Sequence, residues 1–230
     1  MLIKGRLINQ VLHKELTANR QICNNIACMT EDEGSINQQD IWHIPFDQRS
    51  LELFTLPFTT YYEEQRLLDQ FSKETVEKYH IGLVIGRFQP LHYGHIFLMK
   101  QALQIADAII VGIGSSNVRN ADNPFSAEQR EKMLQSALER DTDIRQRILK
   151  IVHVKDYADD TFWLKETLKA VGEEVDIVVG NNDWVNGIFE HANYPALKTP
   201  LYNRNRYEGK KIREYLRNPT KRSNKQFTLS

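Results

Sequence analysis

Residues 82–95 read GLVIGRFQPLHYGH, an apolar run that passes directly into a polar stretch containing glycine. The apolar run predicts a buried strand, Pro90 ends it, and His92, Gly94 and His95 open the helix that follows. Histidines three residues apart share one face of a helix. Gly94 leaves the backbone open to a nucleotide, and the free amides of a helix N-terminus suit a phosphate. Alone, the two histidines are equally compatible with local capping or packing, so the surrounding sequence decides.

Short apolar runs alternate with longer amphipathic segments after residue 81. We predict strands over 82–86, 108–114, 149–154 and 175–180. The helices expected between and after them span 92–106, 126–139 and 161–171, with a last helix starting near Gly209. Ser126 and Gln129 resemble a capping box. This alternation predicts an α/β fold, a Rossmann-like open parallel sheet with helices on both faces, in which ligands bind beyond the carboxyl ends of the strands.

The charge distribution separates the first eighty residues from the rest. Residues 1–80 hold 8 basic and 12 acidic side chains, and the remainder holds 22 and 18. We predict a small N-terminal unit of unclear fold and role over 1–80, an α/β domain over 81–218 and a basic tail over 219–230. Within the first unit, the spacing of apolar residues predicts an amphipathic helix from Tyr61 to Tyr79.

The composition excludes several classes of protein. The chain has 230 residues, of which 41% are hydrophobic, and its 30 basic residues balance 30 acidic ones. A balanced charge gives no general attraction to nucleic acid or to anionic membranes. The longest apolar runs fall short of the ~20 residues that span a bilayer, and the N-terminus lacks a signal-peptide pattern. Because two cysteines also fit a reducing compartment, we expect a cytoplasmic protein with no membrane or nucleic-acid partner.

Several stretches resemble one known family. GRFQPLHYGH is similar to the first motif of the nucleotidylyltransferase superfamily, in the form found in archaeal-type nicotinamide mononucleotide (NMN) adenylyltransferases. Stretches similar to the later motifs follow in the same order at residues 112–134, 154–168, 178–194 and 200–216. The resemblance covers about residues 81–218 and implies a nucleotidylyltransferase domain. It implies that a phosphate oxygen of NMN, or also of nicotinic acid mononucleotide, attacks the α-phosphorus of ATP, forming the dinucleotide (NAD from NMN) and pyrophosphate.

The resemblance also implies roles for individual residues. His92, His95 and Arg213 would be catalytic, and Trp163 and Asp156 would bind the pyridine nucleotide, with the indole stacked on the pyridine ring. The residues implied to bind ATP or its phosphates are Gly86, Arg87, Phe88, Gly94, Asn181, Asn182, Arg204, Gly209, Lys210 and Ile212. The expected partners are ATP and NMN, with Mg²⁺ on the ATP phosphates and no separate metal site; assembly into a homo-oligomer is left open.

Simpler interpretations of these residues stay open. An isolated tryptophan at a helix start is more often a core residue than a ligand contact, and Asn181 with Asn182 is also typical of a turn. The family usually has hydroxyl residues where this chain has Glu208 and Lys210. A carboxylate repels a triphosphate, whereas a lysine offsets that repulsion. The alternatives are another nucleotidylyltransferase (for FMN, pantetheine phosphate or a cytidylyl group) and a catalytically weak NAD- or ATP-sensing protein.

Overall fold

The structure is a computed structural model that describes residues 51, 54–74 and 78–217. These residues all lie in one unit of the chain, 42–230. The expectations for residues 1–50 and for the tail at 219–230 fall outside the described residues, and the division at residue 80 stays a prediction. Within the described ranges, no helix has both the length and the apolar character needed to cross a membrane.

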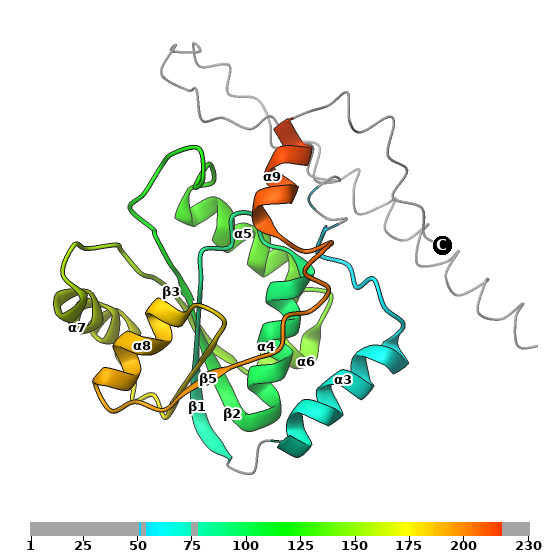
Figure 1. The fold of residues 1–230 in the computed structure, drawn as a ribbon, viewed down its shortest axis with the longest axis horizontal. Helices are drawn as coiled ribbons and strands as arrows, with labels where there is room; N and C mark the ends of the chain where they lie inside the picture. Colours follow the sequence, from blue (N-terminus) through cyan, green and yellow to red (C-terminus); the bar gives the residue numbers. More distant parts are fainter. Residues whose placement is uncertain (1–50, 52–53, 75–77, 218–230) are drawn as a thin grey trace, which may run out of the picture. The chain divides into compact units, whose positions relative to one another are not determined.

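One sheet of five parallel strands forms the centre of the described domain, in the order β3-β2-β1-β4-β5 (Figure 1). The strands are β1 Tyr79–Gly86, β2 Ala106–Ile113, β3 Ile148–His153, β4 Ile177–Gly180 and β5 Ala196–Lys198. The chain adds β2 and β3 on one side of β1 and then crosses over to add β4 and β5 on the other. The neighbouring carboxyl ends of β1 and β4 are therefore the switch point at which folds of this kind bind ligands.

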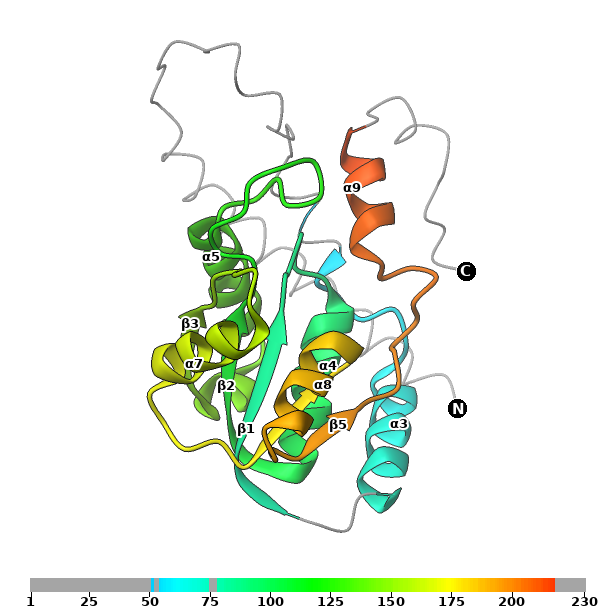
Figure 2. The same ribbon diagram turned by 60° about the vertical axis from the view of Figure 1, so that its left-hand side comes forward.

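Helices cover both faces of the sheet, which confirms the predicted fold class (Figures 1 and 2). The helices on one face are α4 Tyr93–Ile105, α5 Ala127–Leu138 and α6 Thr142–Gln146, and those on the other are α7 Asp160–Val171 and α8 Asp183–His191. Helix α5 begins with the predicted capping box. The Ser126 hydroxyl accepts a hydrogen bond from the Gln129 amide, and the Gln129 side chain accepts one from the Ser126 amide.

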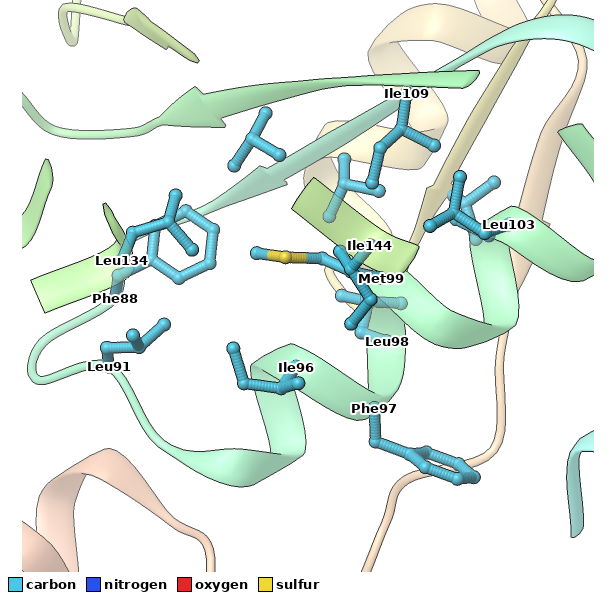
Figure 3. Packing of buried hydrophobic residues seen from close by; sticks show 14 of the residues in the cluster. Phe88, Leu91, Ile96, Phe97, Leu98, Met99, Leu103, Ile109, Leu134 and Ile144 are labelled. Carbon is cyan, nitrogen blue, oxygen red and sulfur yellow. The ribbon is translucent and has the colours of Figure 1, made fainter. Parts of the chain in front are cut away.

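Alternate residues of each strand enter opposite clusters of the core. In β1, Val84 joins the cluster beneath α4, while Leu83 joins the cluster beneath α7 and α8. In β2, Ile109 and Ile110 divide in the same way. Figure 3 shows the first cluster, where side chains of α4 such as Met99 face the sheet. Burial on both faces explains why these strands appear in the sequence as nearly continuous apolar runs.

The N-terminal helix is shorter than predicted. Helix α3 spans Tyr61–Glu74, whereas Tyr79 belongs to β1 and pairs with Ala106 at the start of β2. Tyr79 also packs against the core cluster, so its apolar ring serves the sheet and not an amphipathic helix. Helices α6 and α8 and strand β5 were not predicted from the sequence. Two of these elements are only five and three residues long, too short to show a periodic pattern.

A buried polar cluster joins α3 to α4. The Tyr93 hydroxyl donates a hydrogen bond to the Glu64 carboxylate, and Lys100 Nζ donates to the same carboxylate at 2.6 Å and lies 3.2 Å from Asp141. Burial and the bond to Glu64 raise the pKa of Tyr93. Burial opposes the charge on Lys100, but the two carboxylates raise its pKa overall. Leu68 of α3 joins the core cluster as well, so α3 packs against the core that lies beneath α4.

Candidate active site

A cavity of about 640 Å³ lies at the carboxyl end of β1 and beside the residues that follow β4. Helices α4, α8 and α9 (Gly209–Arg217) all begin at this cavity, and Gly94, Asp183 and Gly209 of their first turns line it. Each helix N-terminus carries partial positive charge and unpaired amides. Three of them around one space favour an anionic ligand.

Most of the predicted site residues meet at this cavity. The predicted residues that line it are Gly86, Arg87, Phe88, His92, Gly94, His95, Asn181, Asn182, Arg204, Gly209, Lys210 and Arg213. Ile212 does not line it. Its side chain is 1% exposed and packs in a small apolar cluster with Leu216 and Phe125, so the structure gives it a place in the core.

His92 and His95 stack on each other at the start of α4. Their ring centroids lie 3.7 Å apart with an interplanar angle of 22°. His95 Nδ1 accepts a hydrogen bond from the His92 amide at 3.3 Å, which places the proton of a neutral His95 ring on Nε2. His92 Nδ1 is buried and has no hydrogen-bond partner among the described residues. The pair therefore caps the helix and also presents imidazole groups to the cavity.

Burial keeps both imidazoles neutral at physiological pH. It lowers the pKa of His92 well below its usual value, with a further contribution from His95, and lowers the pKa of His95 to about 3. An added Cβ on Gly94 would lie 3.1 Å from the His92 ring. Gly94 thus leaves room for the His92 ring, in addition to any role in admitting a ligand. The Phe88 ring meets His95 edge-on at 4.8 Å and is 1% exposed.

Arg213 is the most buried cation of the cavity wall, at 6% exposed. Its guanidinium donates to the Gln89 carbonyl at 2.7 Å and to the Asp122 carboxylate at 3.0 Å. Arg87, Arg204 and Lys210 are exposed and line the same cavity. The four cations outnumber the two carboxylates of the lining, Asp183 and Glu208, so the wall is positively charged overall.

Glu208 and Lys210, which depart from the family motif, both reach this wall. Glu208 lies 3.0 Å from the ammonium of Lys211 and 4.0 Å from the guanidinium of Arg204. The hydrogen bond from Lys211 is the main reason why the pKa of Glu208 is lowered. The Glu208 carboxylate is thus ionised at neutral pH, but it is next to two positive charges.

A second cavity of about 300 Å³ adjoins the first, and Arg87, Asn182 and Trp184 are among the residues that line both. The two predicted pyridine-binding residues, Trp163 and Asp156, line this smaller cavity. Both groups of predicted residues therefore meet at one two-part site.

The smaller cavity has two tryptophans in different environments. Trp163 is 2% exposed, its ring lies 5.1 Å from that of Trp184, and it belongs to the core cluster beneath α7 and α8. Trp184 is 46% exposed. Trp163 is thus both a core residue and part of the cavity wall, whereas Trp184 offers the more accessible ring. Trp184 was not among the predicted site residues, because α8 was not predicted.

The paired asparagines have local structural roles in addition to lining the cavity. Asn182 is the N-cap of α8, and its side-chain oxygen accepts a hydrogen bond from the Trp184 amide at 3.1 Å. Asn181 donates to the Thr199 hydroxyl at 3.1 Å, which connects the ends of β4 and β5. The turn foreseen as the simpler interpretation is therefore a helix cap.

Arg130 holds the loops beneath the site, a role that the sequence analysis did not identify. Its guanidinium is 0% exposed and donates to the carbonyls of Arg87, Gly114, Ser115 and Ser126. Burial lowers the pKa of Arg130 to about 10, so the side chain stays charged at neutral pH. One residue thereby ties the end of β1 to the end of β2 and the start of α5.

Comparison with known proteins identifies the class. A family described as cytidylyltransferase-like matches residues 83–215, which is more than half of the chain. The chain belongs to this family, and the names of its curated relatives show that it is a nucleotidyltransferase.

The curated relatives define the type within this class. The chain is 35% identical over 138 residues to a nicotinamide-nucleotide adenylyltransferase of Thermoplasma volcanium, covering 60% of this chain and 75% of the relative. It is 35% identical over 133 residues to the enzyme of the same name from Archaeoglobus fulgidus, covering 56% of this chain and 75% of the relative. The predicted archaeal NMN adenylyltransferase type is therefore confirmed.

A solved structure agrees with the fold. The crystal structure of a bifunctional NMN adenylyltransferase/ADP ribose pyrophosphatase from Francisella tularensis superposes with a TM-score of 0.53 and 28% identity. The superposed part is 59% of this chain but only 41% of that protein. The likeness thus concerns the α/β domain of the described residues.

Proposed function

We propose that this protein transfers the adenylyl group of ATP to NMN, forming NAD and pyrophosphate, and that nicotinic acid mononucleotide is a second acceptor. The observation that carries the proposal is the two-part cavity. Its larger part combines three helix N-termini with cationic side chains, as a triphosphate requires. Its smaller part shares Arg87 with the larger part. The aromatic rings of Trp163 and Trp184 line this smaller part, as stacking on a pyridine ring requires. The names of the archaeal relatives point to the same pair of substrates.

The reaction needs no protein nucleophile. An oxygen of the NMN phosphate forms a bond to the α-phosphorus of ATP, and the bond from that phosphorus to the bridging oxygen breaks, so that pyrophosphate leaves with the electron pair. Charge grows on the phosphoryl oxygens and on the leaving group, and catalysis depends on positioning and electrostatic stabilisation. Neutral His92 and His95 supply hydrogen-bond donors, and Arg87, Arg204 and Lys210 supply positive charge.

Mg²⁺ enters this proposal as part of the substrate, bound to the ATP phosphates. In the described ranges, no group of three or more His, Cys, Asp or Glu side chains is placed to hold a metal ion. When bound, Mg²⁺ neutralises part of the phosphate charge and assists departure of pyrophosphate. Arg213 also lies at the cavity. Two of its five N–H donors are used by the Gln89 carbonyl and the Asp122 carboxylate, so phosphate binding does not require either contact to break.

The proposal is tested with purified protein, Mg²⁺, ATP or CTP, and a panel of acceptors: NMN, nicotinic acid mononucleotide, FMN and pantetheine phosphate. Pyrophosphate release and the mass of the product identify the reaction. His95→Ala should lower turnover about 100-fold, which is typical of the loss of one preorganised donor. His80→Ala is the matched control, because His80 lies at the other end of β1 with a side chain that is 92% exposed. Unchanged turnover in His95→Ala would contradict the role assigned to this residue.

A second candidate function rests on Glu208, whose carboxylate lines the larger cavity. If its repulsion of the triphosphate outweighs the neighbouring cations, the chain is a catalytically weak protein that senses NAD or ATP. The same assay distinguishes the two functions. A sensor binds NAD or ATP in calorimetry but releases no pyrophosphate with any acceptor.

A further inference from the structure

The segment before α3 lies across the loop that precedes α9 (Figure 2). The Thr59 amide donates a hydrogen bond to the Tyr202 hydroxyl at 3.1 Å, and the Thr59 and Tyr202 hydroxyls are 2.5 Å apart. The Tyr207 hydroxyl donates to the Leu56 carbonyl at 2.6 Å. These bonds join residues 143 and 151 positions apart in the sequence, so they depend on the folded domain.

A charged contact lies between these two hydrogen-bonded residue pairs in the sequence. The guanidinium carbon of Arg206 is 4.5 Å from the centre of the Phe58 ring, a separation at which a cation and an aromatic face attract each other. Arg206 also lies 6.0 Å from the Tyr207 ring. Residues 56–59 thus hold the loop through one cation–π contact and hydrogen bonds to two tyrosine hydroxyls.

The loop that they hold forms part of the larger cavity. Tyr202, Arg204, Tyr207 and Glu208 all line that cavity. Tyr202 and Tyr207 are 5% and 4% exposed, and burial raises the pKa of Tyr207 to about 12. A buried hydroxyl that loses its partner destabilises the conformation that buries it. Without residues 56–59, the loop would therefore favour other conformations.

The same segment is anchored at both ends. Towards its start, Phe54 meets Tyr215 of α9 edge-on at 5.7 Å and joins Ile212 in a small apolar cluster. After its end, Glu64 of α3 is held by Tyr93 and Lys100 of α4. The family match begins at residue 83, so this attachment is made by sequence that precedes the matched domain.

We propose that residues 54–60 are a positioning segment that fixes the nucleotide-binding loop 202–208 in the conformation needed to bind the ATP phosphates. Phe58 and Thr59 are its positioning residues, and they act through Arg206 and Tyr202. The proposal rests on the proposed function, because it gives the segment a role in binding ATP. Residues 54–60 lie before the stretch that resembles the family, so the resemblance gives them no role, and this proposal does.

The test compares Phe58→Ala and Thr59→Ala with the conservative variants Phe58→Tyr and Thr59→Ser in the full chain. Tyr62→Ala is the matched control, because Tyr62 is an aromatic residue of α3 with 78% of its surface exposed. The measurements are kcat, the KM values for ATP and NMN, the melting temperature, and hydrogen exchange of the backbone amides of 202–208 and 181–186.

Phe58→Ala should raise the KM for ATP about three- to ten-fold, as expected for loss of one cation–π contact. The KM for NMN and the kcat should each change by less than about two-fold, because the contact acts on the loop proposed to bind ATP. Exchange should accelerate at 202–208 but not at 181–186, the segment after β4 whose first four residues also line the cavity. Phe58→Tyr and Thr59→Ser should restore the parent values, and Tyr62→Ala should match them.

Exchange at 202–208 that is unchanged in both alanine variants would overturn the proposal. Equal changes in both KM values together with a large fall in melting temperature would also overturn it, because they indicate a purely structural role. Faster exchange at 202–208 in a protein with no activity towards any acceptor would distinguish the positioning role of residues 54–60 from the proposed adenylyl transfer. The segment would then hold the loop, and the proposed adenylyl transfer would be wrong.

Discussion

Lowering the pH from 7 to 5 should destabilise this protein through the stacked pair His92 and His95. A histidine of an unfolded chain takes up a proton with a pKa of about 6.5. In the folded protein, burial holds the pKa of His92 well below that value and that of His95 at about 3. Below about pH 6.5 the unfolded state thus binds protons that the native state does not. The stabilisation is complete above this pH and is lost as the pH falls.

The size of the effect follows from linkage. Each proton bound only by the unfolded state costs about 1.4 kcal/mol per pH unit. From pH 6.5 to 5, the loss is about 2 kcal/mol for His95, whose pKa is about 3, and His92 adds to this loss in the same direction. Domains of this kind have free energies of unfolding of about 5–15 kcal/mol. The loss is therefore a substantial fraction of the total free energy of unfolding.

The assay is urea unfolding between pH 5 and 8 for the parent protein, the double variant His92→Asn with His95→Asn, and the control His80→Asn. The other titrating groups are shared, so the difference in free energy of unfolding between parent and double variant isolates the pair. That difference should fall by at least about 2 kcal/mol from pH 7 to 5, while the control follows the parent. A fall of less than about 1 kcal/mol would refute the idea that the fold holds both rings neutral.

Three further perturbations separate structural from substrate-binding roles. Trp163→Ala should lower the free energy of unfolding by about 3–5 kcal/mol in a denaturant titration, because its ring is buried; an unchanged stability with a raised KM for NMN would show a pure ligand contact. Arg130→Met should cost at least about 2 kcal/mol, because the carbonyls of Arg87 and Gly114 lose a buried donor while those of Ser115 and Ser126 keep bonds from backbone amides. Arg130→Lys should not restore the stability, since an ammonium lacks the fork of donors. Lys210→Ala should raise the KM for ATP in steady-state kinetics, and Lys210→Thr combined with Glu208→Ser should bring it back; no effect of Lys210→Ala would mean that its ammonium faces solvent.

The sequence predicted the parts of the molecule that are set by local patterns. The apolar runs of β1 and β2 and the capping box at Ser126 depend on neighbours in the chain, and they were recognised correctly. The HxGH stretch predicted a cluster at the end of β1, and the structure brings His92 and His95 to a cavity there. The resemblance to the nucleotidylyltransferase family assigned Arg87, Arg204, Lys210 and Arg213 to one nucleotide site, and all four line this cavity.

The remaining features depend on contacts between distant residues. Tyr79 fits a helical spacing, yet pairing with β2 places it in a strand. Trp163 is buried because α7 and α8 pack together, and α8 left no clear pattern in the sequence. The four carbonyls that meet at Arg130 come from loops after β1 and β2 and before α5. No local pattern indicates such convergence.

The wall shared by the two cavities has a thermodynamic consequence. Both cavities are lined by Arg87, Asn182 and Trp184. A ligand in one cavity that orders these side chains therefore strengthens or weakens the binding of a ligand in the other cavity. Thermodynamic linkage makes this influence reciprocal: if the first ligand changes the affinity for the second by some factor, the second changes the affinity for the first by the same factor. The order in which two substrates arrive would therefore alter the path of assembly but not the free energy of the completed complex.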